Sequence, residues 1–178
     1  PYLEVGGSFL VGDVSGVDDE MEASPDPMAA LAPSSANVSL WGADASYTRG
    51  PWDVRAEYLS VTRDAIATSF AGSNGVEILP DLKLEAWYAQ VAYSLSDITS
   101  HPVLQKVEPV VRYGEYKVNG LDELAEEAAE KRVDVGVNYW LAPSIVARGV
   151  VGWRDFTARP AGEPSSETRY MLQFAYGF

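Results

Sequence analysis

The chain reads Arg132-Val133-Asp134-Val135-Gly136-Val137-Asn138-Tyr139-Trp140-Leu141 in its most regular stretch. Apolar side chains occupy every second position from Val133, and polar residues or glycine lie between them up to Tyr139. Because successive side chains of a β-strand point to opposite faces, this period of two predicts a strand with one apolar and one polar face. The pattern recurs in residues 2–12, 38–47, 52–62, 84–95, 106–116, 132–141, 145–154 and 169–178.

The connections between these runs alternate in length. Long polar segments follow the first, third, fifth and seventh runs, and short turns such as Thr48-Arg49-Gly50-Pro51 follow the second, fourth and sixth. Residues 121–130, after the fifth run, predict a short surface helix. Membrane barrels combine short periplasmic turns with long external loops. The sequence therefore predicts an all-β, antiparallel, up-and-down transmembrane β-barrel segment, with residues 1–178 as a single domain.

The aromatic residues indicate which face meets lipid. A soluble sandwich or lipocalin-like barrel buries its apolar face, whereas a membrane barrel turns that face outward. Aromatic rings lie near the ends of the runs, with small and aliphatic residues between them, as the two membrane interfaces favour. We expect a loop-end girdle and a turn-end girdle, made of Trp41, Tyr58, Trp87, Tyr113, Trp153 and Tyr170, and of Tyr47, Trp52, Tyr93, Tyr139, Tyr176 and Phe178.

The composition argues against several other classes of protein. No window is apolar for long enough to form a transmembrane helix, and the absence of cysteine rules out disulfides within these residues. The net charge of −13 argues against nucleic-acid binding. Much of this charge lies in residues 18–26 and 122–130. We interpret these acidic segments as solvated surface next to lipopolysaccharide; the alternative is that they repel anions at a channel mouth.

The polar face carries the candidate pore-lining residues. Arginine stays ionised and binds oxyanions in a fixed geometry, so an open lumen with these side chains would slightly favour small anions. Eight strands alone would enclose a lumen filled by ion pairs, whereas about sixteen leave an aqueous channel. The sequence thus leaves open a porin and a small filled barrel that acts as a scaffold, anchor or adhesin. The predicted pore-lining residues are Arg55, Glu57, Glu108, Arg112, Arg132, Asp134, Arg148 and Arg169.

The sequence offers no convincing catalytic or metal site. His101 is the only histidine, and it lies near Asp97 and Ser100 in a predicted turn. Three residues of one short turn rarely converge as nucleophile, base and orienting group. We therefore expect a protein that is not an enzyme and that holds no metal ion or cofactor.

Several segments resemble the phosphate-selective porin O/P family. They are Trp52-Asp53-Val54-Arg55-Ala56-Glu57-Tyr58, Trp87-Tyr88-Ala89-Gln90-Val91-Ala92-Tyr93, Glu108-Pro109-Val110-Val111-Arg112-Tyr113 and Val135-Gly136-Val137-Asn138-Tyr139-Trp140. The last nine residues, Tyr170-Met171-Leu172-Gln173-Phe174-Ala175-Tyr176-Gly177-Phe178, resemble the C-terminal strand that the barrel-assembly machinery of bacteria reads.

The resemblance starts near Trp41 and concerns the C-terminal half of a family barrel, which has about sixteen strands. It implies a homo-trimeric porin in the bacterial outer membrane, a passive diffusion channel for small hydrophilic solutes or anions that contacts lipid and lipopolysaccharide. It does not carry over a phosphate site, because the lysine and arginine cluster of such a site would lie largely outside these residues. Since the chain begins at Pro1, we expect a processed or incomplete polypeptide.

Overall fold

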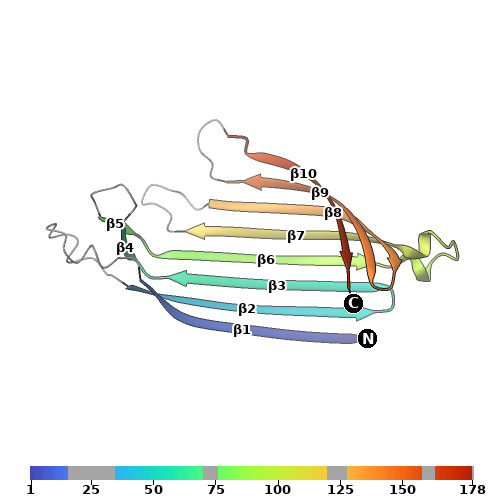
Figure 1. The fold of residues 1–178 in the computed structure, drawn as a ribbon, viewed down its shortest axis with the longest axis horizontal. Helices are drawn as coiled ribbons and strands as arrows, with labels where there is room; N and C mark the ends of the chain where they lie inside the picture. The colour runs from blue at the N-terminus through green and yellow to red at the C-terminus, as the bar shows by residue number, and fades with distance from the viewer. Residues whose placement is uncertain (16–34, 70–75, 120–127, 158–162, 178) are drawn as a thin grey trace.

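A single large antiparallel sheet dominates the computed structural model, which describes residues 1–15, 35–69, 76–119, 128–157 and 163–177. Its eight strands lie in the order β1-β2-β3-β6-β7-β8-β9-β10, so each one pairs with the next long strand of the sequence (Figure 1). This is the predicted up-and-down topology. The strands are β1 (Tyr2–Ser15), β2 (Ser35–Arg49), β3 (Trp52–Arg63), β6 (Leu82–Tyr93), β7 (Val107–Asn119), β8 (Ala128–Ala142), β9 (Ile145–Phe156) and β10 (Ser166–Tyr176).

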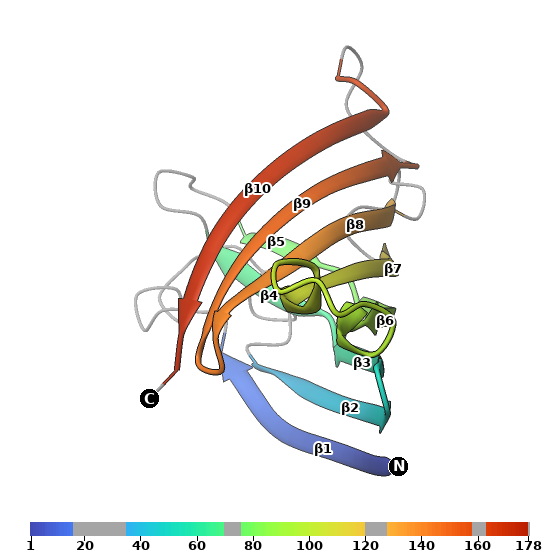
Figure 2. The same ribbon diagram turned by 90° about the vertical axis from the view of Figure 1, so that its right-hand side faces the viewer.

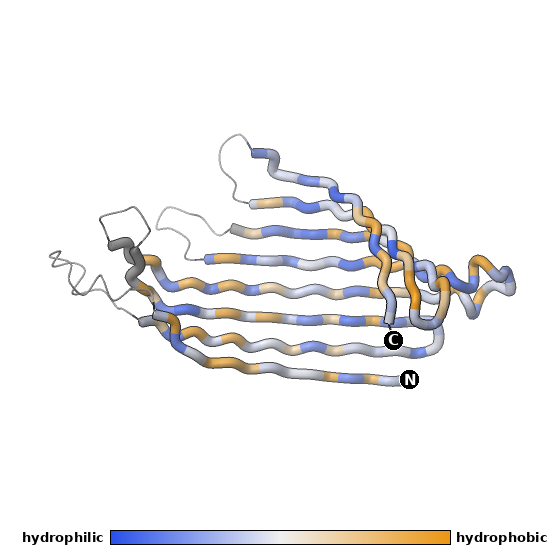
Figure 3. Tube along the Cα trace, viewed as in Figure 1, coloured by the Kyte–Doolittle hydropathy of each residue, from blue (hydrophilic) through white to orange (hydrophobic). Residues whose placement is uncertain are grey.

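The sheet is strongly curved and open (Figure 2). Strands β1 and β10 are its two edges and do not pair with each other, so the eight strands do not close into a barrel of their own. Hydrophobic and hydrophilic residues alternate along the long strands (Figure 3). The eight strands thus form an open sheet with an up-and-down topology, and they do not form the closed eight-stranded barrel that the sequence had left open.

Two predictions about the long connections are wrong. A small hairpin, β4 (Ile66–Ser69) paired with β5 (Val76–Leu79), lies where the sequence predicted only a loop. The helix predicted for residues 121–130 is contradicted at its end, because residues 128–130 already belong to β8; residues 120–127 lie outside the described residues. Alanine and glutamate favour helices, but pairing with β7 overrides this preference here, with Tyr116 opposite Glu130.

The turn end of the sheet is less uniform than predicted. Gly50, with φ of 55°, and Pro51 connect β2 to β3, and a similarly short turn connects β8 to β9. Residues 94–106, in contrast, form a longer connection between β6 and β7 that contains two short 3-10 helices, Leu95–Asp97 and Leu104–Lys106. The Ser94 amide donates to the carbonyl oxygen of Pro51 at 2.8 Å, which joins this connection to the neighbouring turn. Among the described residues, no helix has the length and apolarity needed to cross a membrane.

Candidate functional site: the polar face of the sheet

Two adjacent rows of residues across the sheet have opposite character. Residues that pair across antiparallel strands share a face, so the register of the eight strands defines each row. The central apolar row is Leu3, Tyr47, Val54, Val91, Val111, Val135, Val151 and Tyr170. One position along each strand, the central polar row is Glu4, Ser46, Arg55, Gln90, Arg112, Asp134, Gly152 and Arg169.

Burial along β8 identifies the polar face as the concave one. Asp134 and Asn138 are only 8% and 4% exposed, whereas Val135 and Val137, which lie between them in the strand, are 42% and 46% exposed. The sheet is a single layer, so curvature is what crowds the side chains of one face and separates those of the other. The polar residues therefore point to the inner, concave side and the valines to the outer, convex side.

All eight predicted pore-lining residues lie on the concave face. Arg55, Arg112, Asp134 and Arg169 belong to the central polar row, and a second polar row contains Glu57 and Arg132. A third row, nearer to the turn end, runs from Glu108 through Asn138 to Arg148 and Gln173. The structure thus brings these residues onto one surface, which the register of the strands shows and the sequence order does not.

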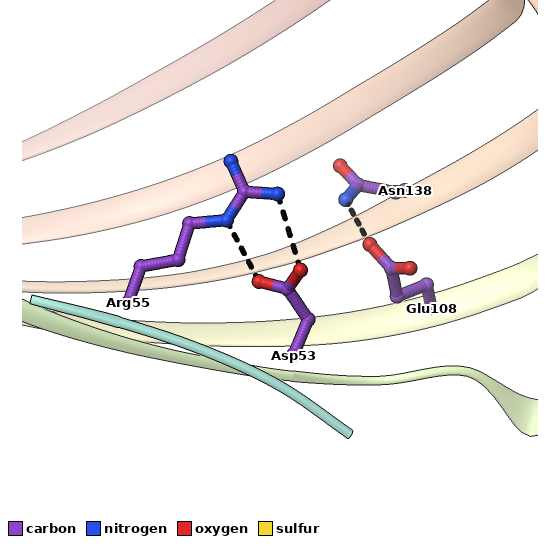
Figure 4. Close-up of polar contacts among 4 residues, drawn as sticks. All are labelled: Asp53, Arg55, Glu108 and Asn138. Carbon is purple, nitrogen blue, oxygen red and sulfur yellow. Dashed lines mark hydrogen bonds and ion pairs between the residues drawn. The ribbon is translucent and has the colours of Figure 1, made fainter. Parts of the chain in front are cut away.

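Several arginines of the concave face form ion pairs. Arg55 Nε donates to Asp53 Oδ1 at 2.8 Å, and its Nη2 donates to Asp53 Oδ2 at 3.1 Å (Figure 4). Arg132 Nε lies 2.7 Å from Asp134 Oδ2, and Arg154 Nε lies 3.2 Å from Glu130 Oε1. These guanidinium groups are thereby held in place, and each has a carboxylate beside it that offsets its charge.

Asn138 links the third row into a hydrogen-bonded chain. Its Nδ2 donates to Glu108 Oε1 at 2.6 Å (Figure 4), and Arg148 Nε donates to Asn138 Oδ1 at 2.7 Å. The amide therefore lies between the acid and the arginine. Arg148 is thereby held by a neutral amide group.

Arg112 is held by an aromatic ring. Its guanidinium carbon lies 3.6 Å from the centre of the Tyr88 ring, which is a cation–π contact. In the part of the chain that the structure describes, neither Arg112 nor Arg148 forms a salt bridge. These two arginines thus differ from Arg55, Arg132 and Arg154.

The structure adds residues that the sequence had not selected. Tyr88 and Asn138 hold the two unpaired arginines, and Glu130, which had been assigned to a helix, pairs with Arg154. Glu130 and Asn138 alternate in phase with the selected charges of β8, and Tyr88 alternates in phase with Gln90, the β6 residue of the central polar row. The alternation of side chains along each strand could have placed Tyr88 and Asn138 on the polar face, but only the strand register reveals their partners.

The described girdle residues all lie on the convex face. Phe178 lies outside the described residues. Rings of neighbouring strands contact each other in three tilted or edge-to-face pairs, and such pairs contribute about 0.5–1.5 kcal/mol each beyond their buried area. The pairs are Trp41 with Tyr58 at 4.8 Å between ring centres, Trp52 with Tyr93 at 4.7 Å, and Trp87 with Tyr113 at 5.4 Å.

A band of opposite charges lies on the convex face at the loop end, next to the rings. We call it the outer charged band; its residues are Lys83, Glu85, Glu115, Lys117, Lys131 and Asp155. The hydroxyl of Tyr58 donates to Glu85 at 2.7 Å, and that of Tyr113 donates to Glu115 at 2.5 Å. The aromatic rings and the charges are therefore directly connected.

The described residues contain no group of three or more acidic, histidine or cysteine side chains able to hold a metal ion. The single histidine has a local structural contact, because the Val103 amide donates to His101 Nδ1 at 3.3 Å within the connection between β6 and β7.

Comparison with known proteins gives one clear result. The profile of the family described as phosphate-selective porin O and P matches residues 15–146, which is well over half of the chain. The match starts ahead of Trp41, where the sequence had shown no family feature, and ends before β10. A search of curated proteins found no match. The family profile, the eight antiparallel strands and the two-faced sheet together show that this chain belongs to the phosphate-selective porin O and P family and forms part of an outer-membrane channel.

Proposed function

We propose that the concave face lines a water-filled passage through which small hydrophilic solutes diffuse passively. The observation that carries this proposal is the offset of one residue between the central polar row and the central apolar row. A charged row across eight strands is costly to bury without water, and an apolar row that is largely exposed is costly to leave in water. A channel wall with lipid on one side and water on the other satisfies both rows.

The free edges of the sheet favour a larger barrel. In a membrane, unpaired backbone groups at a sheet edge find no water to bond, so membrane sheets close on themselves. We propose that further strands pair with β1 and β10, and that residues 1–178 are one wall of a barrel of about sixteen strands. The filled eight-stranded scaffold has no support here, because β1 and β10 lie apart.

Anions are the solutes that the unpaired arginines favour. Arg112 and Arg148 lie on β7 and β9, in one cavity that also touches Gln90 and Asn138. Glu4, Asp44 and Glu57 add negative charge on β1, β2 and β3 instead. We therefore place the path of anions along β7–β9, with the other side of the lumen open to cations.

Ion selectivity measured with the native protein tests this assignment. In planar bilayers under a salt gradient, the double substitution Arg112→Gln with Arg148→Gln is expected to shift the reversal potential toward cations. The matched control is Lys117→Gln with Lys131→Gln, which removes two positive charges from the convex face and is expected to leave ion preference unchanged. A conducting double variant with unaltered selectivity would remove these arginines from the proposal.

The partners follow from the two faces and from the family. We propose that membrane lipid covers the central apolar row and that lipopolysaccharide phosphates contact the lysines of the outer charged band, whose long stems reach headgroups easily. We also propose a homo-trimer, and recognition of the C-terminal strand by the barrel-assembly machinery, on the basis of the family resemblance alone.

A further inference from the structure

A cavity on the concave face lies over Gly114, in the second polar row. Its volume is about 460 Å³, and its wall includes Tyr88, Arg112, Tyr116, Arg132 and Arg154. Gly114 pairs with Tyr88 on one side and Arg132 on the other, so the row has a gap in side chains at this point. A Cβ atom at Gly114 would lie 3.0 Å from the Trp87 carbonyl oxygen and 3.2 Å from Tyr88 Cβ. The tight packing of β6 against β7 therefore favours glycine at this position, and the missing side chain leaves room for the cavity.

Three guanidinium groups from three successive strands border this cavity. Among the described residues, Arg112 on β7 lies against the Tyr88 ring and forms no salt bridge. The carboxylates of Asp134 and Glu130 approach Arg132 and Arg154 at Nε. Arg154 Nε is also buried without a hydrogen bond, because its contact with Glu130 is close but not aligned. The cavity thus offers donors for an oxyanion, with Arg112 the least compensated.

Carboxylates on the same wall determine which anions fit. Glu57, Glu130 and Asp134 also line the cavity, and a carboxylate accepts hydrogen bonds but cannot donate them when ionised. An inorganic oxyanion without a hydroxyl group, such as sulfate, gains nothing from these groups and is repelled by them, and inorganic phosphate offers at most two P–OH donors. A solute that carries hydroxyl groups in addition to its negative group can donate to them.

The size and the aromatic wall point in the same direction. A cavity of about 460 Å³ is within the range of roughly 300–1,000 Å³ for small-molecule sites, and a single phosphate ion would leave most of it empty. The face of Tyr88 is covered by Arg112, whereas Tyr116 is 40% exposed. The Tyr116 ring therefore offers an apolar surface next to the charged groups, as the face of a sugar ring requires.

We propose that the cavity over Gly114 is a solute subsite for hydroxylated organic anions of monosaccharide size, such as sugar monophosphates. The negative group binds at Arg112, the hydroxyl groups donate to Glu57 and Glu130, and the ring lies against Tyr116. This inference rests on the proposed channel function and adds a solute class to it.

Blockade of single-channel current by added solute provides the test. With the native protein in planar bilayers, the concentration of glucose 6-phosphate that halves the current is expected to be at least about tenfold below that of inorganic phosphate or of glucose, because a tenfold gain needs only about 1.4 kcal/mol of extra contacts. Arg112→Gln is expected to remove this advantage. Arg169→Gln, which removes a charge from the same face at β10, is the matched control and is expected to preserve it.

Two further variants separate the sugar contacts from the charge contacts. Tyr116→Ala and Glu57→Gln are each expected to weaken blockade by glucose 6-phosphate several-fold. Blockade by sulfate, which has no hydroxyl donor, is expected to stay unchanged in Tyr116→Ala and to strengthen in Glu57→Gln, because the latter removes a repelling carboxylate. Either variant suffices if the other does not assemble. A conducting native channel that glucose 6-phosphate blocks no better than phosphate or glucose would overturn the subsite and leave the channel intact. A native protein that does not conduct would instead overturn the proposed function.

Discussion

The concave and convex faces of the sheet differ in the positive residues that predominate. Seven of the eight arginines in the described residues lie on the concave face, and three of the four lysines, Lys83, Lys117 and Lys131, lie on the convex face at the loop end; Arg49, which pairs with Trp52 at the turn end, is the convex exception. Arginine presents a rigid planar fork of donors, whereas lysine carries a compact charge on a flexible stem. The comparison indicates that the inner face holds charges in fixed positions and that the outer face lets them follow a mobile surface.

The two faces also differ in how well they can accommodate polar and charged side chains. On the concave face, buried side chains such as Asp134 and Asn138 have hydrogen-bond partners. On the convex face, the valines of the central apolar row have no side-chain group that could form a hydrogen bond. A charged side chain introduced on the concave face should therefore cost little free energy of unfolding. One introduced at the adjacent residue, on the convex face, should cost much more.

The largest expected effect follows from this difference. Val91→Arg places a charge in the central apolar row and is expected to lower the free energy of unfolding by about 2–4 kcal/mol, as for arginine near the middle of a bilayer. Gln90→Arg, at the adjacent position in the central polar row, is the matched control and is expected to cost much less. Denaturant titration of the native protein folded into lipid vesicles measures both. Equal losses would mean that the two faces do not meet different solvents.

A smaller effect concerns selectivity on the concave face. Asp134→Asn removes the carboxylate beside Arg132 and leaves that arginine uncompensated, so the reversal potential is expected to shift toward anions. This direction is opposite to that of the Arg112 and Arg148 substitutions. Asp155→Asn, on the convex face, is the control and is expected to have no effect on selectivity. A shift toward cations in the Asp134 variant would contradict the role given to the ion pairs.

The smallest effect is expected in the outer charged band. Lys83 Nζ lies 3.2 Å from Glu85 Oε1, and the two side chains are 51% and 31% exposed. Lys83→Gln is therefore expected to change the free energy of unfolding by less than about 1 kcal/mol, as for other exposed pairs, and to leave ion selectivity unchanged. The same titration and bilayer recordings provide the values. A selectivity change as large as that of Arg112→Gln would place Lys83 in the conduction path.

The period of two was sufficient to predict the two faces. In β6, Gln90 and Val91 fall on the faces that alternation predicts, and in β8 so do Asp134 and Val135. Side-chain direction in a strand is a local property, so a single sequence contains it. The aromatic residues near the strand ends indicated that the apolar face meets lipid, and the family resemblance added that the sheet belongs to a channel.

The sequence could not predict what depends on register or on tertiary pairing. The contact of Asn138 with Glu108 and Arg148 joins three strands, and the cavity over Gly114 needs the positions of β6, β7 and β8 together. The β4–β5 hairpin was missed because its strands are only four residues long each. The longer β8 was missed because alanine and glutamate at its start favour a helix in isolation.

Chemical labelling at two adjacent positions tests the central claim most directly. The 178 residues contain no cysteine, so one introduced thiol within them can be followed alone. In the native protein reconstituted into lipid vesicles, a charged, water-soluble thiosulfonate reagent is expected to modify Gln90→Cys, and to lower single-channel conductance when it does. It is expected to leave Val91→Cys unmodified until detergent is added. Modification of Val91→Cys at the same rate as Gln90→Cys, or protection of Gln90→Cys in a conducting channel, would contradict a concave face lined by water and a convex face covered by lipid.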